Sequence, residues 1–348
     1  MPVVSATPVT STRLLARFAW FAVFYNVLVI LWGALVRASG SGAGCGNHWP
    51  LCNGQVIPTF SGIHVIVEFT HRAMSGGVDG LVVVALVLWT FRATRRDEAA
   101  RGFAVVTTIL LLTEALLGAL LVKLGYVTGN QSTGRMVLLS IHFSNTMLLL
   151  AALTLMARFL SGSPVSRSQC WANLHRAGGF GWAAAGLVAT IGVGVSGSMA
   201  ALGDTLFPAA SLRAAYAQDF AANSPWLLRL RFVHPLSAVL AAVFVLWLVG
   251  RSRQVGRSRQ TAAEPGAQRH NYRTRLPSLV LGLLGLQFAL GIADVLLLAP
   301  AWMQLLHLLG ADLYWVALVL LAAETIWPRA AGPAFTNAAP PQAAATLA

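Results

Sequence analysis

The chain carries eight apolar blocks, each about 20 residues long, which are separated by short polar or arginine-bearing segments. A helix of this length crosses the roughly 30 Å hydrocarbon core of a bilayer. Hydrophobic residues make up 57% of the chain and charged residues only 10%, which excludes an ordinary soluble domain. The sequence therefore predicts an all-α polytopic membrane protein with eight transmembrane helices, at about 15–36, 64–91, 102–123, 136–160, 177–198, 229–250, 277–299 and 302–327.

The formal net charge of +13 is informative about membrane topology. An even number of spans places both termini on the same side of the membrane. If that side is the cytoplasm, 17 of the 24 Lys and Arg residues fall in inner segments. Seven of these arginines lie between positions 251 and 275. The outer segments hold Arg37, Lys123, Arg135, Arg213, Arg229 and Arg231, and Arg72 lies within a span. The positive-inside rule thus predicts cytoplasmic termini and explains the basic charge without nucleic-acid binding.

The remaining segments complete the expected organisation. Residues 1–14 and 328–348 are rich in Ala, Pro, Ser and Thr and are predicted to be disordered tails, and residues 161–176 form an inner linker. The loop at about 199–228 is long and partly apolar, so we expect a helix on the outer surface there. No cleavable signal sequence or transit peptide is visible, which favours a bacterial plasma membrane.

Four histidines lie within the predicted spans, where an unpaired polar side chain is costly: His71, His142, His234 and His307. The first two are 71 residues apart and the last two 73 residues apart. The segment "TEALLGALL" precedes the second histidine much as "LQFALGIAD" precedes the fourth. The pattern predicts two pseudo-symmetric four-helix bundles, at 15–160 and 177–327, related by an axis along the membrane normal.

Each of the four histidines lies a few residues after the outer start of its helix, so all four have a similar depth. Paired imidazoles inside a helix bundle are suitable axial ligands for haem iron, which predicts one haem for each pair. Two alternatives stay open: one zinc or copper ion bound by all four rings, or rings that only hydrogen-bond neighbouring helices. Solvated or interfacial roles are expected for the other four histidines: His48, His64, His175 and His270. Of these, His64 lies nearest to the depth of the four histidines within the spans.

The first outer loop, "VRASGSGAGCGNHWPLCNGQVIP", is dense in glycine and predicts a compact segment rich in turns. Cys45 and Cys52 lie seven positions apart on the oxidising side of the membrane, where a disulfide is plausible. Two free thiols or a metal site are the alternatives. Cys170 falls on the inner side and is interpreted as a reduced, structural thiol.

One acidic residue lies beside a predicted haem ligand. Glu68 precedes His71 by three residues, so both side chains lie on one face of the second helix. Either Glu68 moves protons beside the haem pocket, or it is the ion-pair partner of the neighbouring Arg72. The other acidic residues near or within spans are interpreted as interhelical hydrogen-bonding groups: Asp79, Glu114, Asp294 and Asp312.

Together these segments resemble the haem A synthase family, membrane enzymes that convert haem O to haem A. The resemblance covers nearly all of residues 15–327. It rests on "GALVRASGSGAGCGNHWPLCNG", "EFTHR", "IHFSNTMLLLAALTL", "GDTLFPAASL", "RLRFVHPLSAVLA" and "LAPAWMQLLHLLGADLYWVALVLLAAE". The chain departs from the family at Asn47 and His48, where many relatives carry an acidic residue before the tryptophan, and its 199–228 loop fits only some branches.

The resemblance implies a role for each histidine pair. His234 and His307 would hold a resident haem b in the half at 177–327, and His71 and His142 would bind the haem O substrate in the half at 15–160. The implied reaction oxidises one ring methyl group of haem O to a formyl group, with water as the oxygen source. Electrons would leave through the resident haem b.

The resemblance also assigns the outer residues. It implies that Glu68 is catalytic and that Cys45 and Cys52 form a disulfide linked to electron transfer or to the integrity of the loop. Five arginines near the outer level are expected to pair with haem propionates: Arg37, Arg72, Arg135, Arg229 and Arg231.

The expected partners are haem O as substrate, haem O synthase, a haem-A-containing terminal oxidase during its assembly, and membrane lipid; a homo-oligomer is compatible with the pattern.

Two other functions fit the same histidines. One is a dihaem b-type electron carrier, and the other is a haem transporter or chaperone. Glu68 and the cysteine pair would have no required task in an electron carrier.

Overall fold

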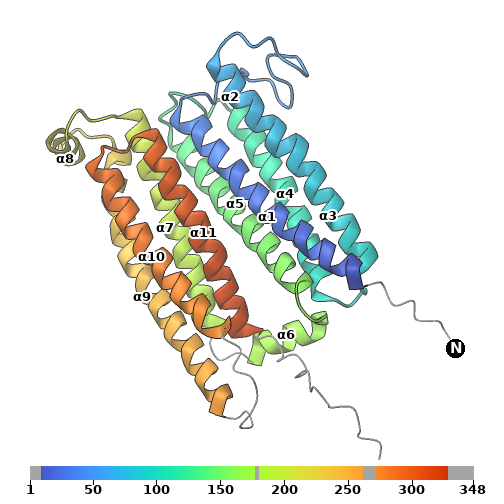
Figure 1. Cartoon of the computed structure of the whole chain (residues 1–348). Coiled ribbons are helices and arrows are strands. Elements are labelled where there is room, and N and C mark those ends of the chain that lie inside the picture. Colours follow the sequence, from blue (N-terminus) through green and yellow to red (C-terminus); the bar gives the residue numbers. More distant parts are fainter. Residues whose placement is uncertain (1–8, 177–179, 262–271, 328–348) are drawn as a thin grey trace, which may run out of the picture.

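The structure is a computed structural model that describes residues 9–176, 180–261 and 272–327. Within these ranges the long helices form two groups that lie side by side (Figure 1). The first group contains α1 (Val9–Ala38), α2 (Ile63–Arg72), the π-helix η1 (Ala73–Asp79), α3 (Gly80–Ala93), α4 (Ala99–Lys123) and α5 (Thr133–Leu160). The second contains α7 (Phe180–Leu206), α9 (Trp226–Thr261), α10 (Tyr272–Leu296) and α11 (Ala301–Ile326).

The described residues include eight helical segments that are long and apolar enough to cross a membrane, with α2, η1 and α3 forming one of them. This confirms the predicted fold class and makes the chain a multi-pass membrane protein. Large apolar side chains on the spans, such as Leu81 and Val188, face outward and are 73% and 68% exposed. In a bilayer such side chains contact lipid, so their exposure is favourable.

The two helix groups meet along one apolar seam. Helix α5 of the first group packs against α7 and α11 of the second, and α1 also packs against α11. Buried side chains from both groups contribute to one large hydrophobic cluster. At its centre the fully buried Trp315 of α11 donates its indole N–H to the carbonyl oxygen of Met147 on α5, at 2.9 Å. The seam therefore combines dry packing with a satisfied polar group.

The second span is not a uniform α-helix, because a π-helical segment of seven residues follows directly after Arg72. Asp79, at the end of this segment, is buried and accepts a hydrogen bond of 2.9 Å from the Asn26 side chain of α1. The Tyr25 hydroxyl donates to the carbonyl oxygen of Met74 at 3.3 Å. Such π-turns are frequent at functional sites, and this one begins two residues after His71.

The short helices lie at opposite ends of the molecule (Figure 1). Helix α8 (Leu212–Phe220) lies at the same end as the 39–62 loop and confirms the helix expected within 199–228. Helix α6 (Arg167–Arg176) lies at the other end, within the segment interpreted as a linker. It is tied to the α3–α4 turn, because the N–H of Arg167 donates to the carbonyl oxygen of Asp97 at 2.6 Å.

Several helix ends differ from the predicted ones. Helix α1 begins at Val9, within the expected disordered tail, whereas residues 1–8 and 328–348 of the predicted tails lie outside the described residues. Helix α7 continues to Leu206 rather than ending near 198, because the polar Asp204 in its last turn pairs with Arg231 of α9 at 2.8 Å. Helix α9 extends into the arginine-rich 251–275 segment as far as Thr261, and residues 262–271 are not described.

Candidate functional site

The second helix group brings two histidines together. The rings of His234 on α9 and His307 on α11 have their centres 6.2 Å apart, with 83° between the ring planes. Two imidazoles that bind one metal ion from opposite sides, each through a nitrogen about 2 Å away, have ring centres roughly 6 Å apart. The pair therefore has the spacing that axial ligation of one haem iron requires.

The other ring nitrogen of His234 is held by the backbone. Its Nδ1 lies 3.1 Å from the carbonyl oxygen of Val193 on α7 and 3.3 Å from the Ser196 hydroxyl. Because a carbonyl oxygen only accepts, Nδ1 carries the proton and Nε2 keeps its lone pair for a metal. The Nδ1 atom of His307 is buried and makes no hydrogen bond within the described residues. These donor atoms fit a haem held by two histidines.

The first group holds the other two histidines, His71 on α2 and His142 on α5. The Nδ1 atom of each ring is buried and has no hydrogen-bond partner in the described part of the chain. The described residues include no group of three or more His, Cys, Asp or Glu side chains suited to one metal ion. The single-ion alternative therefore receives no support from the described residues, whereas interhelical hydrogen bonding by a ring is observed for His234 alone among the four rings.

Each of the four rings packs beside a glycine of a neighbouring helix. A Cβ atom added to Gly33 of α1 would lie 3.0 Å from Cε1 of His71, and one added to Gly197 of α7 would lie 2.8 Å from Cε1 of His234. The corresponding distances are 4.0 Å between Gly118 of α4 and His142, and 3.4 Å between Gly291 of α10 and His307. The glycines therefore provide the space in which the rings sit, most tightly at the first two positions.

These four glycines were not singled out from the sequence. A glycine in a membrane helix is common, so composition alone does not mark it as functional. The available signal was the repeat itself, because "TEALLGALL" and "LQFALGIAD" align Gly118 with Gly291. If the aligned glycines are taken as packing partners of the aligned histidines, Gly118 and Gly291 can be identified from the sequence.

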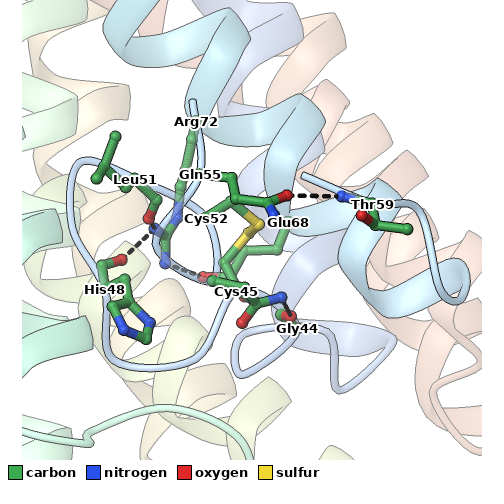
Figure 2. The surroundings of a disulfide bond; sticks show 10 residues. Gly44, Cys45, His48, Leu51, Cys52, Gln55, Thr59, Glu68 and Arg72 are labelled. Carbon is green, nitrogen blue, oxygen red and sulfur yellow. Dashed lines mark hydrogen bonds and ion pairs between the residues drawn. A yellow bond between two sulfur atoms is a disulfide. The ribbon is translucent and has the colours of Figure 1, made fainter. Parts of the chain in front are cut away.

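Glu68 is 3% exposed, and both of its carboxylate oxygens are engaged (Figure 2). The backbone N–H of Cys45 donates to Oε2 at 2.7 Å, and Nη2 of Arg72 lies 2.5 Å from Oε1. Arg72 also donates from Nη1 to the carbonyl oxygens of His48 and Leu51, at 2.5 and 2.6 Å. The ion pair weighed from the sequence is therefore present, and it ties the carboxylate to the outer loop.

The loop itself is closed by a disulfide between Cys45 and Cys52, as expected, and both cysteines are buried. The backbone N–H of Asn53 donates to the carbonyl oxygen of Cys45 at 3.0 Å, which adds a second link across the loop. Cys170 is a free thiol on α6. Partial burial raises its pKa, against a smaller opposite effect of Arg158, so Cys170 stays protonated and unreactive at neutral pH.

The arginines expected near the outer level have diverse contacts. Arg37 of α1 reaches across the seam and donates to the carbonyl oxygen of Ala201, the Thr205 hydroxyl and the Gln304 side chain, at 2.8, 3.1 and 2.9 Å. Arg231 pairs with Asp204 and Asp219 at 2.8 and 3.0 Å. Arg135 donates to the carbonyl oxygen of Asn130 at 2.7 Å, and its Nε is buried without a hydrogen bond among the described residues. Arg229 is exposed.

Two of the remaining histidines have partners that are not among the four paired rings. His64 shares a hydrogen bond of 3.0 Å with the Ser41 hydroxyl at the start of α2. The exposed His175 packs against Trp171 on α6, and His270 lies outside the described residues.

Two of the four acidic residues interpreted as interhelical hydrogen-bonding groups have that role. Asp79 accepts from Asn26 of α1, and Glu114 of α4 accepts from Asn145 and Thr146 of α5. The expectation fails for Asp312, which is fully buried on α11 but has no hydrogen-bond partner among the described residues. The Oδ1 atom of Asp294 likewise has none there.

The COX15-CtaA family, described as "Cytochrome oxidase assembly protein", matches residues 16–62 and 59–319 of this chain. The match includes both histidine pairs, Glu68 and the disulfide loop. The chain belongs to this family. Family membership confirms the resemblance drawn from the sequence motifs.

Curated relatives carry two different names. "Heme A synthase" of Exiguobacterium sp. is 34% identical over 42% of this chain and 46% of that protein, and that of Alkalihalophilus pseudofirmus is 38% identical over 37% and 41%. A "Protoheme IX farnesyltransferase" of Thermus thermophilus is 42% identical over 90% of this chain. This alignment covers 48% of the Thermus protein, so the chain spans about half the length of the curated relatives it matches.

Proposed function

We propose that this protein is a haem A synthase that oxidises a ring methyl group of haem O to a formyl group. The observation that carries this proposal is the position of Glu68: a buried carboxylate, one helical turn before His71, held by both the disulfide loop and Arg72. A dihaem electron carrier or a haem transporter has no need for a positioned carboxylate beside one of its two haem sites. The heme A synthases among its relatives support the same activity.

The two helix groups have different tasks in this proposal. His71 and His142 hold the iron of haem O in the first half, 15–160, and His234 and His307 hold a resident haem b in the second, 177–327. In support, Arg231 stands three residues before His234, where Glu68 stands before His71, so only the first half has a carboxylate at this place. The pseudo-twofold relation between the halves is part of the proposal.

The net reaction converts a methyl group and one water molecule into a formyl group, four protons and four electrons. When bound, the resident haem b would accept these electrons one at a time and pass them on. The protein positions the substrate through the two ring nitrogens of the first half. Glu68 orients or deprotonates the water that supplies the formyl oxygen, in a general base role.

The outer loop keeps Glu68 in place for this role. An amide N–H and a guanidinium already hold this carboxylate in one rotamer. It therefore loses little side-chain conformational entropy when it reaches the geometry needed for the reaction. Arg72 links the same carboxylate to the carbonyl oxygens of His48 and Leu51, which is a second connection between the disulfide loop and Glu68. Propionate binding by Arg135 and Arg229 is also part of the proposal, since most donor atoms of Arg37, Arg72 and Arg231 already have protein partners.

We place the protein in a bacterial plasma membrane with both termini in the cytoplasm and both haem sites near the outer face. The excess of arginine in the proposed inner segments supports this orientation. The disulfide supports it too, because the 39–62 loop would then lie in an oxidising compartment. Haem O synthase would supply the substrate, and a haem-A-containing terminal oxidase would receive the product during its assembly.

Pigment analysis tests the activity directly. The protein is co-expressed with a haem O synthase in cells that make no haem A, and extracted haems are separated by chromatography. A formyl-bearing haem supports the proposal. Unchanged haem O with a bound b-type spectrum indicates a carrier or transporter, and a protein without haem removes the whole class. Farnesylated haem in cells without a haem O synthase would instead indicate the activity named for the Thermus relative.

A further inference from the structure

The two histidine pairs differ in a neighbouring residue on the third span of each half. Glu114 of α4 and Gln287 of α10 both stand four residues before the glycine that packs on a histidine ring, Gly118 and Gly291 respectively. The rings in question are those of His142 and of its counterpart on α11. One half therefore offers a carboxylate at a place where the other half offers a neutral amide.

Glu114 reaches the ring of His142. Its Oε1 lies 3.5 Å from Nδ1 of His142, a distance at which charge matters although the pair makes no hydrogen bond within the described residues. Two side chains of α5 hold the carboxylate there: Asn145 donates to Oε2 at 2.6 Å, and the Thr146 hydroxyl donates to Oε1. The carboxylate is thus fixed by contacts that do not depend on the histidine.

Gln287 has no comparable relation to His307. Its Nε2 is buried and has no hydrogen-bond partner among the described residues, and it lies against Gly310 of α11, where an added Cβ would be 2.2 Å away. The Nδ1 atom of His307 also has no partner in that part of the chain. The nearby amide brings no net charge to this second pair.

We infer that Glu114 is a positioning residue that makes His142 the more electron-rich axial ligand and so lowers the reduction potential of the haem in the first half. A histidine that binds iron through Nε2 carries its proton on Nδ1, and a carboxylate facing that proton raises the basicity of the ligand. A more basic ligand stabilises iron(III) relative to iron(II), and axial ligands and their hydrogen bonds are the main means by which proteins set haem potentials.

The inference rests on the proposed function, because it takes the four histidines as haem ligands. It adds to that function a preferred direction of electron transfer between the two halves. With the lower potential in the half that would hold haem O, electron transfer from that half to a haem in the second half, away from the substrate, would be favourable. The charge of Glu114 therefore favours withdrawal of electrons from the half that holds Glu68 and the substrate methyl group.

Potentiometric titration of the purified full-length protein loaded with protohaem tests the inference. The wild type should show two transitions, and His307→Ala assigns them by removing that of the second half. Glu114→Gln should raise the lower of the two reduction potentials by at least about 59 mV. For one electron, this shift corresponds to a tenfold change in the ratio of reduced to oxidised haem. The reciprocal Gln287→Glu should lower the potential of the second half.

Thr113→Val is the matched control, because Thr113 donates to Asn145 at 2.7 Å and lies in the same polar cluster without touching the carboxylate. It should leave both potentials unchanged. Unchanged potentials in Glu114→Gln with both haems bound overturn the inference, as does an equal shift in Thr113→Val. These results leave the proposed function standing, whereas a wild-type protein that binds no haem in either half overturns both.

Discussion

The backbone N–H of Cys45 donates to Oε2 of Glu68 at 2.7 Å, so the loop that the disulfide closes also holds the carboxylate beside His71 (Figure 2). The contact joins the 39–62 loop to Glu68 on α2 through Cys45, which also forms the disulfide with Cys52. It means that a change in the loop reaches the proposed catalytic group directly. The following predictions for the loop and the carboxylate depend on this contact.

Glu68→Gln should keep both haems bound but lower the conversion of haem O by about 100-fold or more, the usual contribution of a general acid or base. The amide keeps the size of the side chain and loses its charge and basicity. The measurement is the ratio of haem A to haem O in extracted pigments. Glu98→Gln, in the turn between α3 and α4, is the control and should convert normally. Normal conversion in Glu68→Gln would remove this residue from the mechanism.

Replacing Cys45 and Cys52 together by serine should destabilise the protein by about 2 kcal/mol, the chain-entropy value for so short a loop. Conversion should also fall, because Cys45 no longer holds its N–H at Glu68. Thermal unfolding in detergent followed by circular dichroism, with and without a reductant, measures the first effect, and pigment analysis measures the second. Cys170→Ser should change neither. A double variant with full conversion would show that the disulfide does not position Glu68.

If His234 and His307 hold the proposed resident haem b, His234→Ala should abolish its b-type absorption spectrum, because one of two rings whose centres lie 6.2 Å apart is lost. The purified variant is compared with His48→Ala, which changes a loop residue and should keep the spectrum. Retention of the resident b-type spectrum in folded His234→Ala would mean that the ligand pairing is wrong.

Gly197→Ala should distort the same site from the other side. The added Cβ would lie 2.8 Å from Cε1 of His234, so the ring or helix α7 must move, at a cost of about 1 to 3 kcal/mol. Haem content and the electron paramagnetic resonance signal of the ferric protein report the displacement. Gly192→Ala on the same helix meets nothing within 4 Å and should behave as wild type. Equal effects of the two substitutions would point to helix flexibility rather than to the contact with His234.

Arg37→Ala should loosen the seam between the two helix groups. The substitution leaves the carbonyl oxygen of Ala201 and the side chains of Thr205 and Gln304 without their donor, at a cost of about 2 to 4 kcal/mol. The midpoint of thermal unfolding in detergent should fall accordingly. Arg213→Ala, at an exposed position of α8, is the control and should leave the midpoint unchanged. A stable Arg37→Ala protein that loses haem would instead assign Arg37 to a propionate.

The eight spans follow from the sequence because crossing a bilayer as a helix requires about 20 apolar residues, and this requirement acts on each segment independently. The four histidines could also be identified in this way, since a polar ring within a span stands out against its apolar neighbours. Helix ends were less predictable. Helix α7 runs past position 198 because Asp204 meets Arg231 of another helix, a contact that no local pattern contains.

Sequence alone therefore determined the membrane class, the number of spans, the spacing of the four histidines within the spans, and the motifs of the family. All of these are local or periodic features of the chain. Tertiary structure decided which partners the polar side chains chose. Arg37 crosses the seam to α7 and α11, Glu68 is held by Cys45 and Arg72, and Glu114 approaches His142 while Gln287 stays apart. The physical reason is that a buried polar group can bond only a donor or acceptor within its reach, and how the helices pack decides which groups are within reach.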